Sequence, residues 1–348
     1  MIDLIDKLES ERRLSRSEFA DLVRTPAPES RRYAHDLARR TSEARFGRRI
    51  FIRGLIEFTN FCRNDCYYCG IRRGNRMAER YRLDKPTILE CCRIGHELGF
   101  RTFVLQGGED AYFTDETLCD LVACIRKEYP DCAITLSAGE RSRESYQKLF
   151  DAGANRYLLR HETADPEHYA RLHPASLSLA NRKRCLLDLK EIGFQTGCGF
   201  MVGSPFQTAE NIADDLLFIR ELEPEMVGLG PFIPHKDTPF AAYPAGDVEL
   251  TLFLLSLVRI MAPATLLPAT TALGTMDEEG REKGILAGAN VLMPNLSPPG
   301  VRGKYLLYDN KASSGAEAAE HVRELDRRMQ AIGYHLAVDR GDYQPVCR

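Results

Sequence analysis

Short apolar runs alternate with amphipathic segments along most of the chain, about every 25 to 40 residues. Eight runs have the length and flanking turns of buried strands, and the segments between them repeat apolar residues at helical spacing. The strand runs cover residues 51–59, 102–109, 133–140, 156–163, 195–203, 226–232, 266–273 and 289–295. Repeated strand–helix units of this kind build a parallel sheet, so the pattern predicts an α/β protein with a complete (β/α)8 TIM-type barrel.

The two ends of the chain follow a different pattern. Residues 2–45 repeat apolar positions at helical spacing, with Ser15 or Ser17 as a possible cap, and residues 315–333 do the same without a strand run before them. We therefore predict N-terminal helices over 1–45 that pack on the barrel, the barrel itself over 46–310, and a C-terminal helix and tail over 311–348.

Composition limits the possible functions without naming one. The chain has 348 residues, of which 44% are hydrophobic and 28% charged, as in ordinary soluble enzymes. Its first residues lack the apolar stretch of a signal peptide, and no apolar run is long enough to span a membrane. The net charge of −3 gives no sign of nucleic-acid binding, and the 11 cysteines suit a reducing compartment. We expect a cytoplasmic protein that binds neither nucleic acid nor membranes.

Three cysteines, Cys62, Cys66 and Cys69, carry the strongest chemical signal. Their C-x3-C-x2-C spacing, with Tyr68 before the last one, suits a single cubic iron–sulfur cluster. A cube normally takes four protein ligands, so three leave one iron open to a small molecule. A structural zinc site would need a fourth ligand, and no second cysteine knuckle follows. The pattern resembles the signature of the radical S-adenosylmethionine (SAM) enzymes, in which SAM chelates the open iron.

Polar residues gather at the predicted carboxyl ends of the strands, where TIM-type barrels place their chemistry. The stretch Gln106–Gly108 exposes backbone that could hold the SAM ammonium group, although a glycine pair is often only a turn. Glu162 suits the two hydroxyls of a ribose, with an internal salt bridge to Arg160 as the alternative. Arg182 is either a carboxylate-binding guanidinium or a solvated charge on a helix.

Beyond the cysteines the resemblance becomes specific. The runs CRNDCYYCGIRR, LQGGEDAYF, RYLLRHETADP, MVGLGPFIPHKDTPFA, LPATTALGT and AGANVLMPN are similar to those of the HydE family of radical SAM maturases, which help assemble the cluster of FeFe-hydrogenase. The similarity extends from about residue 5 to about residue 335. Methylornithine synthase and biotin synthase share the barrel and the cysteines, but RHETADP, GPFIPHKDTP and PATTALGT favour HydE.

This chain departs from the family pattern at two points. The GEDP run ends in Ala111 instead of proline, which puts the shape of that loop in doubt. The second cysteine trio that some members carry after the last strand is missing from YLLYDNKASSG, so we expect no second cluster.

The resemblance implies one 4Fe-4S cluster, SAM and a substrate cavity inside the barrel. The SAM site would consist of Tyr68, Gln106, Gly107, Gly108, Ser137, Glu140, Glu162 and Arg182. The cavity would be lined by Arg156, Met226, Thr270, Thr271, Met293 and Tyr305.

The implied reaction is reductive cleavage of SAM to a 5′-deoxyadenosyl radical, with no single protein residue assigned as catalytic. The radical would act on a small iron–cysteine complex with CO and cyanide ligands. The implied partners are a low-potential donor, flavodoxin or ferredoxin, and other hydrogenase maturases.

Two other functions stay open at this point. One is a radical SAM enzyme that acts on a small organic substrate, like methylornithine synthase or biotin synthase. The other is a non-catalytic iron–sulfur scaffold, although a scaffold would not need a closed barrel with Gln106, Arg160 and Glu162 at its mouth. Formation of 5′-deoxyadenosine separates an enzyme from a scaffold.

Overall fold

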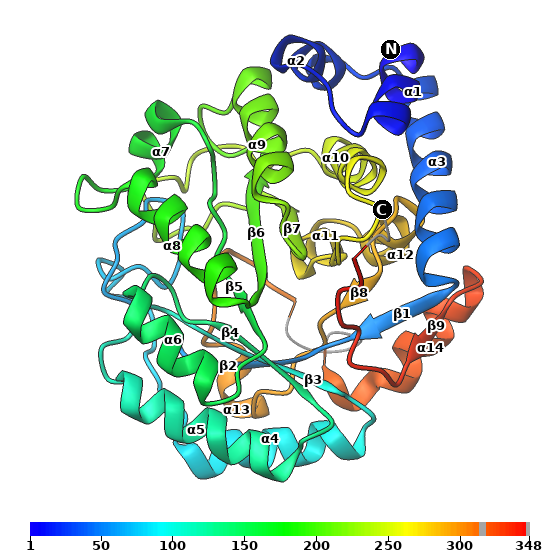
Figure 1. The fold of residues 1–348 in the computed structure, drawn as a ribbon. Helices are drawn as coiled ribbons and strands as arrows, with labels where there is room; N and C mark the ends of the chain where they lie inside the picture. The colour runs from blue at the N-terminus through cyan, green and yellow to red at the C-terminus, as the bar shows by residue number, and fades with distance from the viewer. Residues whose placement is uncertain (313–317, 346–348) are drawn as a thin grey trace.

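The centre of the computed structural model is a ring of parallel strands surrounded by helices (Figure 1). The structure describes residues 1–312 and 318–345. Among these residues, one continuous sheet has six strands in chain order, β2 (Gly54–Thr59), β3 (Thr102–Gly107), β4 (Ala133–Ser137), β5 (Arg156–Leu158), β6 (Gln195–Val202) and β7 (Met226–Pro231). Because each strand runs parallel to the next, all their carboxyl ends lie at one end of the ring.

Isolated bridges close the ring between β7 and the first strand. Leu266 pairs with Met226 of β7, and Pro268 pairs with Val291 of β8 (Val291–Leu292). β8 pairs in turn with β1 (Arg49–Ile52), which continues into β2 after a break at Arg53. The prediction of a complete barrel is therefore confirmed. The run 266–273 forms bridges instead of a regular strand, because Pro268 has no amide hydrogen to donate and helix α11 (Thr271–Met276) begins within the run.

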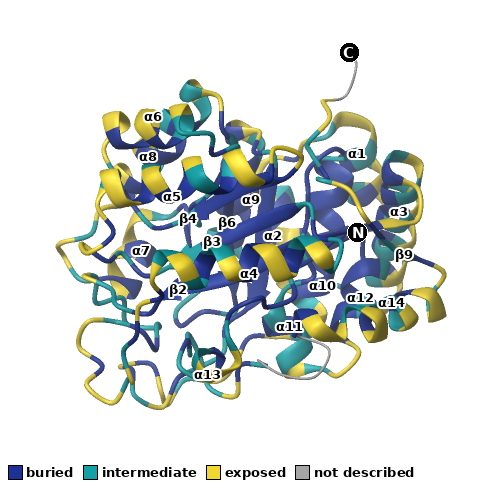
Figure 2. Cartoon of the chain, turned by 90° about the horizontal axis from the view of Figure 1, so that it is seen from below, coloured by how far each residue is buried: buried dark blue, intermediate teal, exposed yellow. Residues whose placement is uncertain are grey.

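The outer helices turn their apolar faces toward the ring and their polar faces outward (Figure 2). Between the strands lie α4 (Lys85–Glu97), α5 (Asp115–Glu128), α6 (Arg143–Asp151), α7 (Pro166–Leu172), α8 (Leu179–Ile192), α9 (Ala209–Leu222), α10 (Val248–Met261) and α12 (Gly280–Leu286). Most begin at an Asp, Ser or Thr side chain that accepts a first-turn amide, as Ser142 does for α6 and Ser178 for α8. In the described part of the chain, none of these helices is both long enough and apolar enough to cross a membrane.

Both ends of the chain pack on the barrel. The helices α1 (Ile2–Glu11), α2 (Arg16–Arg24) and α3 (Pro28–Phe46) lie against α9 and α10, and Ser15 caps α2 by accepting the amide of Glu18 at 3.3 Å. After α13 (Pro299–Arg302), the chain forms η2 (Ala319–His321), α14 (Val322–Ala331) and β9 (His335–Ala337). β9 pairs with the start of β1, so the tail covers the amino-terminal end of the ring. Residues 315–317 of the predicted C-terminal helix lie outside the described residues.

Candidate active site

The three cysteines lie on the loop of residues 60–84 that connects β2 to α4 at the carboxyl end of the ring. Cys62, Cys66 and Cys69 are all partly buried free thiols. Backbone hydrogen bonds of 2.8–3.0 Å tie this loop to three other segments, from Arg63 to the carbonyl of Glu109, from Tyr67 to that of Leu172 and from Gly70 to that of Leu307. The chain itself therefore shapes the loop that presents the thiols.

The three thiols are weak acids in this environment. Burial raises the pKa of Cys69 to about 12 and the pKa of Cys66 well above its usual range, and the charges of neighbouring thiolates raise both further. Burial also raises the pKa of Cys62. Three thiolates can coexist here only beside a strongly cationic partner, because their repulsion is poorly screened away from water. Iron–sulfur clusters take such thiolate ligands, so the donor set fits the predicted cluster.

Gly108 packs directly against the cysteine loop, and Gly107 packs against the end of β2. A Cβ at Gly108 would lie 2.2 Å from the carbonyl oxygen of Phe61 and 2.8 Å from Cys62 Cβ, and one at Gly107 would lie 2.8 Å from a methyl carbon of Thr59. Side chains larger than hydrogen would force the loop away from β3. The sequence predicts that these glycines let a ligand approach, which stays a prediction; in addition, Gly108 lets the cysteine loop approach β3.

Gln106 and Ser137 stand side by side at the carboxyl ends of β3 and β4. Gln106 is also level with Glu57 of β2, and Tyr305 lies near enough to both side chains to feel their electrostatic influence. Glu57 is fully buried and forms an ion pair with Lys311. Two predicted SAM residues and one predicted cavity residue therefore come together at the mouth of the barrel.

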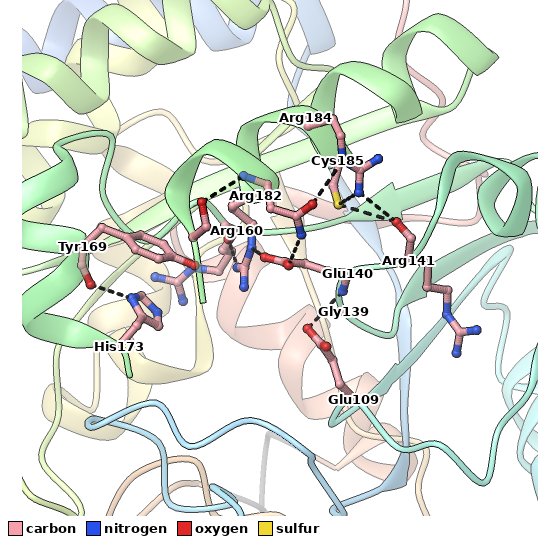
Figure 3. A network of polar contacts seen from close by, with 12 residues as sticks. Glu109, Gly139, Glu140, Arg141, Arg160, Tyr169, His173, Arg182, Arg184 and Cys185 are labelled. Atoms are coloured by element: carbon pink, nitrogen blue, oxygen red, sulfur yellow. Dashed lines mark hydrogen bonds and ion pairs between the residues drawn. The ribbon is translucent and has the colours of Figure 1, made fainter. Parts of the chain in front are cut away.

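Glu140 and Arg182 form a buried ion pair (Figure 3). The Arg182 Nε of α8 donates to a Glu140 oxygen, and its Nη1 donates to the carbonyl of Arg160 at 2.6 Å. The Glu140 amide donates in turn to Glu109 Oε1 at 3.0 Å. Arg182 is therefore not a solvated helix charge, and its guanidinium links three strand ends around the predicted SAM site.

Tyr68 is held by His173, which Figure 3 labels beside Tyr169. Its hydroxyl lies 3.1 Å from His173 Nε2, and His173 Nδ1 lies 3.0 Å from the carbonyl oxygen of Tyr169. Burial lowers the pKa of His173 to about 3, so its ring stays neutral. Its Nε2 therefore accepts a hydrogen bond from the Tyr68 hydroxyl. The aromatic residue between the second and third cysteines thus has a fixed orientation.

Glu162 stands in a strained conformation after β5. The prediction of one alternating strand over 156–163 is wrong beyond Leu158, because the chain leaves the regular ladder there and Glu162 has a φ of +67°. Its amide donates to the carbonyl of Gly199 at 3.0 Å. Its Oε2 lies 3.2 Å from Arg160 Nη2 but makes no hydrogen bond within the described residues. A strained residue with an unsatisfied buried carboxylate is typical of a ligand site.

Asp215, a buried acid that no sequence pattern predicts, holds the segment around Glu162 in place. Asp215 of α9 is fully buried, its Oδ1 accepts the Ala164 amide at 2.5 Å, and the same oxygen lies 3.2 Å from His161 Nε2. Gly199 donates its amide to His161 Nδ1 at 3.3 Å. Burial raises the pKa of Asp215 and lowers that of His161. His161 therefore faces the helices, and the pair brackets Glu162 on both sides.

Inside the ring, the structure adds a residue that sequence reasoning missed. Arg53, at the break between β1 and β2, is 5% exposed, and its Nη1 contacts Met226 Sδ at 2.9 Å. Its Nε and Nη2 have no hydrogen-bond partner among the described residues, and the same holds for the hydroxyls of Thr135 and Thr270. Burial and the nearby charge of Arg156 hold the pKa of Arg53 well below its usual value. Unsatisfied buried donors of this kind favour an anionic ligand.

Arg156 lies at the amino-terminal end of β5, away from the cysteine loop. Its side chain donates to Gln195, Thr102, the carbonyl of Arg340 and the carboxylate of Asp342 at 2.7–3.0 Å. Four of its five N–H groups are therefore used by the protein. This predicted cavity residue mainly anchors the C-terminal tail, and Arg53 has more free donors for a ligand.

Among the remaining predicted cavity residues, Met226 contacts Arg53. Thr270 occupies the N-cap position of α11 without a side-chain capping hydrogen bond, and a Cβ at Gly230 would come within 2.9 Å of its hydroxyl. Thr271 is the first residue of that helix, and Met293 packs in one apolar cluster with Met226. Tyr305 stands apart from this group, nearer to the cysteines. The predicted cavity therefore has two parts: Tyr305 lies at the mouth near the cysteines, and Arg53 and Arg156 lie deeper in the ring.

The comparisons with known proteins agree with this geometry. The sequence model of the Radical SAM superfamily matches residues 56–219. The chain is 49% identical over 265 residues to the FeFe hydrogenase maturase subunit HydE of Thermotoga maritima, which covers 76% of this chain and 75% of that protein. This chain belongs to the HydE family. It is a radical SAM enzyme, and that superfamily implies a 4Fe-4S cluster and SAM, for which the three cysteines of the loop are present.

Two further relatives show how widely the HydE-family fold is shared. The crystal structure of a methylornithine synthase matches with a TM-score of 0.84 and 26% identity, over 96% of this chain and 97% of that one. The hydrogenase maturase HydG matches with a TM-score of 0.81 and 21% identity, over 97% of this chain and 75% of that one, which shows the fold alone.

Proposed function

We propose that this HydE-family enzyme acts in the assembly of the FeFe-hydrogenase active-site cluster. Its substrate would be a small anionic iron complex with cysteine, CO and cyanide ligands, bound inside the barrel. The observation that carries the proposal is Arg53, a buried guanidinium with free donors and no carboxylate partner within the described residues. An anionic substrate would satisfy the free donors and also compensate the buried charge, which a neutral substrate would leave without a counterion.

The residues at the mouth divide the work of binding. Cys62, Cys66 and Cys69 would hold the cluster, and the strand ends from Gln106 to Glu162 would orient SAM beside it. When bound, the cluster and SAM supply a one-electron cleavage that yields a 5′-deoxyadenosyl radical. The closed ring surrounds this site and keeps bulk water from the reacting groups.

The interior charge favours an anion. Arg53 and Arg156 lie close enough to influence each other's charge, and Asp342 is the carboxylate that pairs with Arg156. The buried charge of Arg53 is therefore left without a paired carboxylate among the described residues. An anion placed there would make charge-assisted hydrogen bonds to Arg53. The thioethers of Met226 and Met293 would form a soft, polarizable wall suited to a metal carbonyl.

The Arg53→Met variant tests this proposal. Methionine removes a desolvated charge that has no carboxylate partner, so we expect the fold to keep its melting temperature. SAM cleavage to 5′-deoxyadenosine with dithionite should continue, whereas maturation of FeFe-hydrogenase should fall by about tenfold or more, as for loss of a hydrogen bond to a charged group. Arg40→Met, at an exposed site on α3, is the matched control. Normal maturation by Arg53→Met would place the substrate elsewhere.

A second candidate is a radical SAM reaction on a small organic substrate. The chain is 26% identical to the 3-methylornithine synthase of Methanosarcina barkeri over 98% of its own length. Arg53 could bind the carboxylate of an amino acid as it could bind another anion. Assaying the purified enzyme for 3-methylornithine separates the two candidates, because only the second predicts that product. Under the first, a low-potential electron donor and other hydrogenase maturases would be the protein partners.

A further inference from the structure

The stretch that carries the cysteines is strongly basic although the chain is not. Residues 63–82 contain six arginines and two carboxylates, while the whole chain has a net charge of −3. Half of these arginines build the loop: Arg72 pairs with Asp65 at 2.8 Å, Arg82 pairs with Asp110 at 2.7 Å, and Arg80 donates to four backbone carbonyls. These contacts explain three of the six arginines by local structure.

The other arginines point to solvent. Arg73 and Arg76 are exposed, and neither side chain has an ion-pair or hydrogen-bond partner within residues 1–312 and 318–345. Arg63 is 63% exposed while it contacts Glu109 at 3.0 Å. Unpaired arginines contribute nothing to the fold here, so their charge is available to a partner.

Two large apolar side chains are exposed in the same region. Met77 follows Arg76 directly and is 77% exposed, and Tyr112 is 61% exposed. The guanidinium of Arg82 lies 4.8 Å from the centre of the Tyr112 ring. Together, Arg63, Arg73, Arg76, Met77 and Tyr112 define what we name the cysteine-loop face. Exposed apolar side chains with a charged rim are typical of interaction sites.

Hydrogen bonds join this face to the cysteines. The Arg73 amide donates to the carbonyl of Asn64 at 2.8 Å, between the first two cysteines, and the Arg63 amide donates to Glu109 at 2.9 Å. Arg73 follows Cys69 by four residues, so their Cα atoms are within about 14 Å of each other by the reach of the chain. A protein cannot approach the thiols from inside the closed ring, and the outer side of the loop is the route left to it.

We propose that the cysteine-loop face is the docking site for an acidic one-electron carrier protein. This inference rests on the proposed radical SAM function, which requires an electron. The carrier gives up one electron and is oxidised by one, the cluster is reduced by one, and no proton or bond moves across the interface. Charge complementarity selects an acidic partner over the many neutral and basic proteins in a cell, and it speeds their encounter.

The double variant Arg73→Glu/Arg76→Glu tests the docking site. Immobilised, cluster-loaded enzyme is titrated with oxidised flavodoxin, an acidic carrier of this class, at about 0.01 M and about 0.1 M salt, where the Debye length falls from about 30 Å to about 10 Å. Wild-type affinity should fall as salt rises. The double variant should bind at least about tenfold more weakly at low salt and lose most of the salt dependence.

A second readout uses the source of electrons. With reduced flavodoxin, the double variant should form 5′-deoxyadenosine about tenfold more slowly than wild type, whereas with dithionite the two should agree. The matched control is Arg32→Glu/Arg327→Glu, which changes the same charge at side chains 72% and 73% exposed on α3 and α14. The control should behave as wild type in both assays.

The outcomes separate this inference from the proposed function. No 5′-deoxyadenosine from wild type with dithionite would refute the radical SAM reaction, and the binding titration would still decide the docking site. Unchanged flavodoxin affinity in the double variant, or an equal loss in the control, would overturn the docking site alone. Tighter binding of a DNA duplex than of flavodoxin to this face would also overturn it, by assigning the arginines to another class of partner.

Discussion

Replacing Glu162 tests how far the strained segment after β5 serves SAM. In Glu162→Ala, the carboxylate is lost while the cysteine loop keeps its contacts. A hydrogen bond to a charged group contributes about 1.5–3 kcal/mol, so we expect the Kd for SAM to rise roughly ten- to hundredfold. Glu162→Gln keeps the shape and one acceptor and should lose less. SAM titration followed by EPR of the reduced cluster measures both.

The folded protein pays two free-energy costs at Glu162, which indicate that the residue is kept for binding. A non-glycine residue in the left-handed region costs about 1–2 kcal/mol, and Glu162 has a φ of +67°. Its buried Oε2 makes no hydrogen bond in the described structure. Both costs persist only because other contacts hold the segment, through the Gly199 carbonyl and through Asp215.

Glu162→Gly separates binding from stability. Glycine adopts a positive φ without strain, so this variant should melt no lower than wild type although it binds SAM weakly. The opposite pattern, with SAM affinity unchanged and the melting temperature lowered, would refute the reasoning. It would assign Glu162 to an internal ion pair with Arg160, which lies 3.2 Å away.

Three other predictions probe the rest of the account. Anaerobic reconstitution should give about four irons per chain, and about eight irons would show that the cluster ligands are wrongly assigned. Cys66→Ala should abolish SAM cleavage, whereas Cys198→Ala, at a thiol buried in the core, should leave it intact. Loss of cleavage in Cys198→Ala would also show a wrong assignment. Gly108→Ala should lower the iron content because its Cβ would meet the cysteine loop at 2.2 Å, whereas Gly300→Ala, with nothing within 4 Å, should not. Burial alone would raise the pKa of Asp342, but Arg156 and hydrogen bonds hold it below its usual value. This contact therefore stabilises the fold above about pH 4 and is lost as pH falls further, so the melting-temperature gap between wild type and Asp342→Asn should shrink from about pH 6 toward about pH 3.

The sequence predicts the ring and the place of the cysteines because both depend on local patterns. Apolar runs of strand length recur between amphipathic helices, and parallel strands necessarily bring their carboxyl ends together. That geometry alone places Gln106, Ser137, Glu140 and Glu162 near the cysteine loop. The aromatic Tyr68 and the glycine pair are found by their position next to that loop.

The missed residues depend on packing between distant segments. Arg53 is a charged residue inside an apolar run. Only the folded structure shows that its Nη1 contacts Met226 Sδ and that its Nε and Nη2 have no partner among the described residues. Asp215 follows Asp214 on α9, and no sequence pattern tells which of the two acids is buried. The family resemblance places Arg156 in the cavity, and its partner Asp342 lies 186 residues away, beyond the reach of any periodicity argument.

Some predictions concern features that the described structure does not reach. Cys347 lies outside the described residues, as do residues 313–317 of the segment where the second cysteine trio is missing from the sequence. The number of clusters therefore stays a prediction that iron and sulfide analysis decides. The domain boundaries at 45 and 310 also stay predictions, and the contacts of the tail with β1 and Arg156 show that the C-terminal segment packs on the amino-terminal end of the ring.

The central claim is that this enzyme cleaves SAM for a small anionic iron complex held near Arg53. The most direct measurement is the yield of 5′-deoxyadenosine from cluster-loaded enzyme, SAM and dithionite, with and without the iron–cysteine complex that bears CO and cyanide. The account predicts that the complex raises the yield in wild type and fails to do so in Arg53→Met. A yield that does not respond to the complex, together with one that rises with an organic amino acid, would contradict the claim.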